Sequence, residues 1–305
     1  MMRTNVEFRA RDVTLRGWLY RPEGDGPFPI CIVSHGWSCV KEQTLDVVAE
    51  HMVKAGVAAL VYDQRNLGES DGEIRGHIDP WEQIHDARAA VSYAETLDGI
   101  DPGRIGIWGT SYSGAHAIVV SAVDSRVKAG CAQVPMLAGL ANIQRLAETM
   151  NGWKPFIEML NDERRRWARG EPPAMIAVCS DDPAVPHAFP GLRTHAFFHA
   201  WGDRAANWKN ECTVQSLDLC LEYDPTPYLE ALGTTPFQFV IGEDDMTTPA
   251  DIAIAGFARI KGPKELKIIP GDHYTSYIEY IDEAAAAAAD FMTRQLNRSL
   301  WTPQP

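Results

Sequence analysis

The sequence of 305 residues predicts an α/β fold, in which a mainly parallel twisted sheet is flanked by helices. Short apolar runs of strand length alternate with segments of helical periodicity, which is typical of strands joined by crossover helices. No long Gly- or Ser-rich linker, internal repeat or block of like charges divides the chain. The alternation is interrupted once, between the expected strands 129–134 and 237–241. These observations predict one core with an insertion rather than two independent domains.

Each element of this core is predicted by a local pattern. The expected strands are residues 13–20, 30–34, 58–62, 105–109, 129–134, 237–241 and 265–269. The expected helices are residues 44–55, 80–97, 111–122, 249–259 and 277–296. A run of alanines at 284–289 lies in the last of these helices, where small side chains allow close packing against a sheet.

The insertion occupies residues 136–232 and separates the core segments 1–135 and 233–305. Segments this long between elements of a compact domain are usually functional covers. We therefore predict a helical lid. Its aromatic content is not enriched, so an apolar pocket does not follow from composition. The candidate substrate-binding residues in the lid are Trp153, Trp201 and Trp208.

Composition excludes several classes of function. The net charge of −13 disfavours nucleic-acid binding, which needs clustered positive charge. No apolar stretch approaches the roughly 18–20 residues of a membrane-spanning helix. The first residues lack the apolar core and cleavage site of a signal peptide, so a cytoplasmic protein is expected. Six cysteines without metal-ligand spacing predict structural thiols and no metal site.

A strand-to-helix junction at residues 104–117 contains the most informative motif, with Ser111 at the turn. A nucleophilic serine in such an elbow needs small neighbours where strand and helix come close, and Gly109, Ser113 and Gly114 supply them. The usual pattern is G-x-S-x-G, and here Ser113 replaces the last glycine. The helix N-terminus also favours negative charge near the serine oxygen. The alternative is a glycine-rich turn that only packs.

A second turn favours the catalytic interpretation. His35, Gly36 and Trp37 follow the expected strand 30–34, where hydrolases with this elbow carry an oxyanion donor. The predicted donors are the backbone amides of Trp37 and Tyr112, because two fixed N–H groups stabilise a developing alkoxide. We expect His35 itself to have a structural role and not to act as an acid or base.

The acidic partner is expected after the strand 237–241. Counting from Gly242 and from Pro249, the spacing G-x-x-D-x-x-x-P selects Asp245. The neighbouring Asp244 remains the alternative.

The expected general base is His273, in a sharp turn at residues 270–273 before the last helix. The chain order of Ser111, Asp245 and His273 is the order of α/β-hydrolases and differs from the trypsin-like and subtilisin-like orders. Histidines and aspartates to which the sequence assigns structural roles include His51, His85, His116, Asp63, Asp71 and Asp86.

Several longer segments resemble a known family. They are residues 35–42 (HGWSCVKE), 62–72 (YDQRNLGESDG), 78–81 (IDPW) and 105–114 (IGIWGTSYSG), with 170–173, 207–211 and 221–225 in the insertion. Together they resemble bacterial α/β-hydrolases of the dienelactone-hydrolase-like, polyketide-transferase-like group. The resemblance implies the α/β-hydrolase fold and the same Ser-Asp-His set. It also implies esterase, thioesterase or acyl-transfer activity, and related families cleave lactones or carbon–carbon bonds.

The sequence therefore predicts a serine hydrolase that cleaves a small-molecule carboxylic ester or thioester through an acyl-enzyme on Ser111, with no cofactor. A carbon–carbon bond hydrolase or an acyltransferase with the same triad remains open, as does a non-catalytic ligand-binding protein. A peptidase is disfavoured, because the chain has no room for the extra β-domain of such relatives. A homodimer is also open, with Trp301 as a candidate contact.

Overall fold

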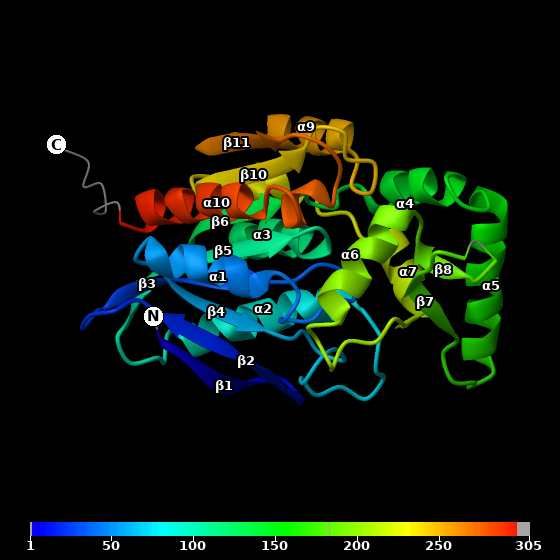
Figure 1. The fold of residues 1–305 in the computed structure, drawn as a ribbon, viewed down its shortest axis with the longest axis horizontal. Coiled ribbons are helices and arrows are strands. Elements are labelled where there is room, and N and C mark those ends of the chain that lie inside the picture. Colours follow the sequence, from blue (N-terminus) through cyan, green and yellow to red (C-terminus); the bar gives the residue numbers. More distant parts are fainter. Residues whose placement is uncertain (1, 183, 298–305) are drawn as a thin grey trace.

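The computed structural model describes residues 2–182 and 184–297, and its centre is a sheet of eight strands in the order β1-β2-β4-β3-β5-β6-β10-β11 (Figure 1). The strands are β1 (Met2–Ala10), β2 (Val13–Arg21), β3 (Phe28–Ser34), β4 (Ala58–Tyr62), β5 (Ile100–Thr110), β6 (Val127–Gln133), β10 (Phe237–Gly242) and β11 (Lys264–Ile269). β1 and β2 are antiparallel to their neighbours, and the remaining pairs are parallel. The predicted mainly parallel sheet is confirmed.

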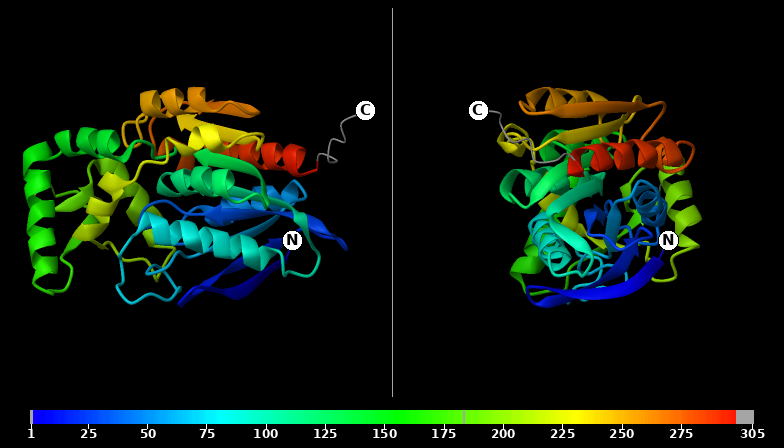
Figure 2. Two further views of the ribbon diagram at one scale, coloured as in Figure 1. Left: turned by 180° about the vertical axis from the view of Figure 1, so that it is seen from behind. Right: turned by 90° about the vertical axis from the view of Figure 1, so that its left-hand side faces the viewer.

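Helices cover both faces of this sheet. One face is covered by α1 (Leu45–Lys54) and α10 (Ile281–Leu296), which lie in front in Figure 1. The other is covered by α2 (Pro80–Ala94), α3 (Tyr112–Val123) and α9 (Ala250–Arg259), and the view from behind in Figure 2 shows α2 and α3 in front. Because both faces are covered, every residue of the central strand β4 is buried.

The alanine run in α10 packs as predicted. Ala284, Ala285, Ala288 and Ala289 are buried in the cluster that joins α10 to the sheet. On β5 beneath the helix, a Cβ atom at Gly106 would lie only 2.8 Å from the sulfur of Met292. Small side chains therefore allow helix and strand to approach closely.

The strand β1 was not expected from the sequence. It pairs along its whole length with β2 at the edge of the sheet, and most of its side chains are exposed. An exposed edge strand needs few apolar residues, so the apolar periodicity that identifies buried strands is weak here.

The insertion between β6 and β10 is more than helical, which corrects the prediction of a helical lid. It contains α4 (Gly139–Glu148), α5 (Trp153–Ala168), α6 (Leu192–Gly202), α7 (Val214–Glu222) and α8 (Tyr228–Ala231). It also contains a three-stranded sheet of β7 (Met175–Cys179), β8 (His187–Phe189) and β9 (Cys212–Thr213). Figure 1 shows α4 to α7 with this small sheet at one end of the central sheet. The short helix α8 packs against α3 and α9 of the core.

Three further expectations concern the whole chain. In the described segments, no helix combines the length and apolar character needed to cross a bilayer. All six cysteines are buried and unpaired. Trp301, the candidate contact in a homodimer, lies outside the described residues, and the dimer itself stays a prediction.

Candidate active site

Ser111 lies in a strained turn between β5 and α3. Its φ of 54° and ψ of −116° belong to a backbone region that a residue with a side chain rarely adopts. Hydrogen bonds to neighbouring segments stabilise the turn, because the Ser111 amide donates to the Gln133 carbonyl at 2.8 Å and the Ser111 carbonyl accepts from the Met136 amide at 3.0 Å. The predicted elbow is thus present in the backbone.

The small neighbours of Ser111 are required by close backbone approach. A Cβ atom at Gly109 would lie 2.0 Å from the Ser113 carbonyl oxygen, and one at Gly114 would lie 3.0 Å from Pro135. The contact at Gly109 is too short for any larger residue without a backbone shift, and the contact at Gly114 is tighter than most side chains make. Glycine is therefore required at position 109 and favoured at position 114.

Ser113, the departure from the usual motif, has a specific role. Its hydroxyl donates to the His35 carbonyl at 2.5 Å and accepts from the Gln64 side-chain amide at 2.7 Å. All three residues are buried. A glycine at this position could make neither bond, so the hydroxyl links the elbow to the turn that follows β3.

His35 braces that same turn. Its Nε2 accepts from the backbone amide of Gln64 at 3.2 Å. The proton of the neutral ring is therefore on Nδ1, which donates to the Gly36 carbonyl at 3.0 Å. Burial lowers the pKa of His35 to about 4, which keeps the ring neutral near pH 7. His35 therefore has the structural role that the sequence predicted.

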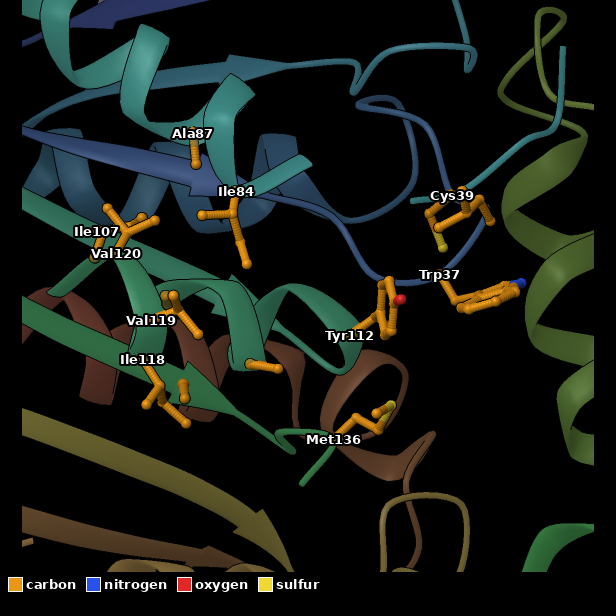
Figure 3. Close-up of a cluster of buried hydrophobic side chains, with 14 of the residues drawn as sticks. Trp37, Cys39, Ile84, Ala87, Ile107, Tyr112, Ile118, Val119, Val120 and Met136 are labelled. Atoms are coloured by element: carbon orange, nitrogen blue, oxygen red, sulfur yellow. The ribbon is translucent and has the colours of Figure 1, made fainter. Parts of the chain in front are cut away.

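The turn with the two predicted oxyanion donors runs directly beside Ser111. A Cβ atom at Gly36 would lie 3.2 Å from the Ser111 Cβ and 3.8 Å from its Oγ. In the described part of the chain the Trp37 amide has no acceptor, and the Tyr112 amide, at the first position of α3, has no intrahelical one. The rings of Trp37 and Tyr112 are in contact, with centroids 4.9 Å apart. Figure 3 shows these two rings at one end of the buried apolar cluster, near Met136.

Asp245 and His273 are brought together from two different loops. The His273 Nδ1 lies 2.7 Å from the Asp245 Oδ2, and the two residues are only 4% and 2% exposed. The other carboxylate oxygen, Oδ1, accepts from the amides of Thr247 and Thr248, both at 2.8 Å. The Thr248 hydroxyl lies 2.9 Å from Oδ2. These contacts fix the orientation of the buried Asp245 carboxylate.

Asp244, the alternative acid, points elsewhere. It is exposed, and its backbone amide donates to the Gly271 carbonyl at 2.9 Å. Burial and the bond to His273 thus distinguish Asp245 from its neighbour.

Ser111 and His273 line a common cavity of about 30 Å³. Ser111 also lines a second cavity of about 20 Å³, together with Met136 and Ile143. The two cavities share Ser111, Trp37, Phe189 and Thr247. The space beside the serine is therefore divided into two small compartments.

The aromatic residues that the insertion contributes to these compartments are Phe189, Phe197 and Phe198. The three tryptophans expected in this role line neither of them. Trp153 stacks on Phe156, Trp201 lies 4.7 Å from the Arg204 guanidinium, and the Trp208 Nε1 donates to the Ser38 carbonyl at 3.0 Å. The pattern HAFPG around Phe189 offered no periodicity from which its position could be inferred.

One acidic cluster near the site has the composition of a metal site. It consists of Glu42, Asp63 and Glu69, but the Lys41 ammonium lies at its centre, 2.7–2.9 Å from one oxygen of each. Burial alone would lower the pKa of Lys41, but the Asp63 charge and the three acceptors raise it above its usual value. A side chain of the same protein therefore occupies the centre of the cluster, and Asp63 anchors its loop as predicted, accepting from the backbone amides of Lys41 and Glu69.

Comparison with known proteins identifies the family. The family model described as X-Pro dipeptidyl-peptidase (S15 family) matches residues 12–170, more than half of the chain. The chain belongs to this family. This α/β-hydrolase is also 30% identical to a thiohydrolase from Eupenicillium brefeldianum over 292 residues, which are 92% of this chain and 90% of that protein. It is 27% identical to the polyketide transferase grgF of a Penicillium species over 297 residues, 96% of this chain and 97% of that one.

Solved structures agree with this assignment. The crystal structure of the α/β-hydrolase GrgF from Penicillium sp. sh18 aligns with a TM-score of 0.82 and 26% identity, over 97% of this chain and 99% of that one. The structure of DcsB in complex with its substrate analogue aligns with a TM-score of 0.83 and 28% identity, over 96% and 100% of the two chains. The predicted fold and the assignment as a hydrolase are thus confirmed.

Proposed function

We propose that this hydrolase cleaves a small-molecule carboxylic ester or thioester through an acyl-enzyme on Ser111, with His273 as general base and Asp245 as its partner. One observation carries the proposal. Ser111, in a strained turn at the start of α3, lines the same cavity as His273, whose Nδ1 bonds a buried carboxylate. A nucleophile, a base and an acid that orients the base form the arrangement used in serine-based acyl transfer.

In the first step the Ser111 Oγ attacks the acyl carbonyl carbon, and its proton moves to the His273 Nε2. The resulting imidazolium then donates this proton to the leaving alcohol or thiol as the bond to the acyl group breaks. In the second step His273 takes a proton from water, which attacks the acyl-enzyme and releases the carboxylic acid. The proton finally returns to Ser111.

The negative oxygen of each tetrahedral intermediate would accept hydrogen bonds from the amides of Trp37 and Tyr112. The free Trp37 amide and the contact of Gly36 with Ser111 support this role. Loss of one such donor typically raises the barrier by about 2.7–4 kcal/mol. The cost is this large because fixed dipoles in a water-poor site need no reorganisation as charge develops.

Asp245 would hold the proton of the neutral imidazole on Nδ1 and leave Nε2 free as a base. It would also stabilise the imidazolium in the transition state. Its own orientation is determined by the two amides and the hydroxyl around its carboxylate.

The proposal is tested by intact mass after treatment with a fluorophosphonate. We expect one adduct on the wild-type protein, none on Ser111→Ala, and an unchanged adduct on Ser121→Ala, a buried serine of the same helix. Hydrolysis of para-nitrophenyl acetate and of a thioester should follow the same pattern. A wild-type protein that takes no adduct and hydrolyses neither compound would favour the ligand-binding alternative.

Acyl transfer to an acceptor other than water is the second candidate. It is favoured by the similarity to a protein named polyketide transferase. Product analysis with an ester in the presence of an alcohol distinguishes the two, since transfer yields a new ester and hydrolysis only the acid. An X-Pro dipeptide anilide in the same assay tests peptidase activity.

A further inference from the structure

A third cavity, much larger than the two beside Ser111, lies within the insertion. Its volume is about 390 Å³, and it is formed by α5, β7, β8 and α7 with the loops between them. Apolar side chains dominate its wall, among them Met150, Phe156, Met159, Ile176, Leu192 and Leu217.

Phe189 lies at the boundary between this outer cavity and the site. Its chain neighbours Ala188 and Pro190 line the outer cavity, whereas Phe189 itself lines both small compartments beside Ser111. Its ring contacts the edge of Trp37, with centroids 5.8 Å apart. The three-residue strand β8 therefore lies between the two sites. Ala188 lines the outer cavity, and Phe189, the last residue of the strand, lines the compartments beside Ser111.

The volumes show why such a boundary matters. A single water needs about 10–15 Å³ in this measure, so compartments of 30 and 20 Å³ accommodate only a few non-hydrogen atoms each. An acetyl group fits, but a longer chain must extend elsewhere. The outer cavity of 390 Å³ has the size of a ligand site, for which about 300–1,000 Å³ is typical.

The chemistry of the outer cavity favours an aliphatic chain. Val185 and Leu192, which belong to its wall, are 41% and 73% exposed, so apolar surface also surrounds its opening. Its one acidic residue, Asp181, is exposed and lies 3.8 Å from His195. Exposed apolar side chains around a concave apolar site are typical of ligand-binding surfaces.

We propose that the outer cavity binds a medium-length aliphatic chain of the substrate, and that Phe189 separates this chain site from the reacting carbonyl. The proposal rests on the proposed function, because it assigns a substrate class to the same Ser111 site. A chain attached to a carbonyl at Ser111 reaches the outer cavity only when the Phe189 ring turns aside. Phe189 then determines whether short or long chains react efficiently.

The first test fills the outer cavity. Met159→Trp adds bulk to its wall, and Glu158→Trp adds the same bulk to the exposed side of the same helix, as a matched control. Each buried methylene group contributes up to about fourfold to binding. We therefore expect Met159→Trp to lower the ratio of kcat/KM for para-nitrophenyl decanoate over the acetate at least tenfold, and Glu158→Trp to leave it unchanged.

The second test removes the boundary. Phe189→Ala joins the outer cavity to the site, so the ratio of decanoate to acetate should rise. The ratio for decyl acetate over ethyl acetate, measured on the same variants, identifies whether the chain belongs to the acyl or the alcohol part. Ratios that no variant changes in either series, with the Ser111 adduct intact, would overturn the chain site and leave the proposed function standing.

Binding without turnover separates the two proposals further. Calorimetric titration of Ser111→Ala with the decanoyl thioester of N-acetylcysteamine should show saturable binding, weakened at least tenfold by the added Met159→Trp. Equal affinity of the single and double variants would refute the chain site, whether or not Ser111 proves to be the nucleophile.

Discussion

Replacing Ser113 by alanine removes one hydroxyl group from the connection between the elbow and the turn after β3. This hydroxyl donates to the His35 carbonyl and accepts from the Gln64 side chain, at 2.5 and 2.7 Å. The variant loses both bonds in a site from which water is excluded. One contact between the two residues remains, because the side-chain nitrogen Nε2 of Gln64 also lies 3.4 Å from the His35 carbonyl oxygen.

The expected loss of stability follows from these contacts. A net hydrogen bond contributes about 0.5–1.5 kcal/mol, and a buried group left without a partner costs about 1–3 kcal/mol. Because one contact can partly replace those lost, we expect a decrease of about 1–3 kcal/mol in the free energy of unfolding. With an unfolding entropy of about 2.1 cal/mol/K per residue, this lowers the Tm of a chain of 305 residues by about 2–5 °C.

The chain offers a matched control on the same helix. The Ser121 hydroxyl is also buried, but it has no hydrogen-bond partner among the residues that the structure describes. Ser121→Ala removes the same atom without breaking a bond, so its Tm should equal or exceed that of the wild type. Differential scanning calorimetry of the three proteins measures the difference directly.

Activity provides an independent measurement. Ser113 holds the carbonyl of the residue two positions before Trp37, so its loss should loosen the proposed oxyanion donor. We expect a lower kcat with an unchanged KM, and a decrease smaller than the roughly 10²–10³-fold that follows removal of a donor itself. A Ser113→Ala protein with the Tm and kcat of Ser121→Ala would refute the role assigned to this hydroxyl.

Three further predictions concern other contacts. Asp245→Asn should lower kcat by about 10⁴-fold at little cost in stability, because the amide favours the wrong tautomer of the imidazole; steady-state ester hydrolysis measures this. Burial lowers the pKa of His116 to about 3, so its contribution to stability is complete above pH 6.5 and is lost as the pH falls below that value. Between pH 6.5 and 5 the loss is about 1.5 kcal/mol, and denaturant titration should show a shallower pH dependence for His116→Phe. Lys41→Met leaves Asp63 as an unpaired buried charge and should destabilise the protein by about 3–5 kcal/mol in the same titration.

Each of these variants has a control. Asp244→Asn changes the exposed neighbour and should keep full activity; a comparable loss would contradict the choice of Asp245. His51→Phe removes a partly exposed histidine instead of a buried one and is the control for His116→Phe; an equally shallow pH dependence of both variants would contradict the role of burial at His116. Lys54→Ala removes an exposed pair with Glu50 at 3.9 Å and should cost less than about 1 kcal/mol. If Lys41→Met costs no more than Lys54→Ala, the acidic cluster does not depend on its lysine.

Local patterns in the sequence were sufficient to predict the sheet, the elbow and the order of the three proposed catalytic residues. Seven of the eight strands were recognised, because buried parallel strands such as β3, β4 and β10 are continuous apolar runs that pack on both sides. The elbow was recognisable because its close backbone approach permits only small side chains beside Ser111. β1 was missed because its exposed side chains leave no such periodicity.

The surroundings of the site depended on contacts between residues far apart in the chain. Spacing selected Asp245, but its burial against His273 became visible only when two loops after β10 and β11 were brought together. The role of Ser113 likewise depends on partners about 50 and 78 positions away. The expected tryptophans of the insertion line neither compartment beside Ser111, whereas Phe189 does. A three-residue strand carries almost no periodic signal, and which side chain reaches a cavity depends on how the insertion packs against the core.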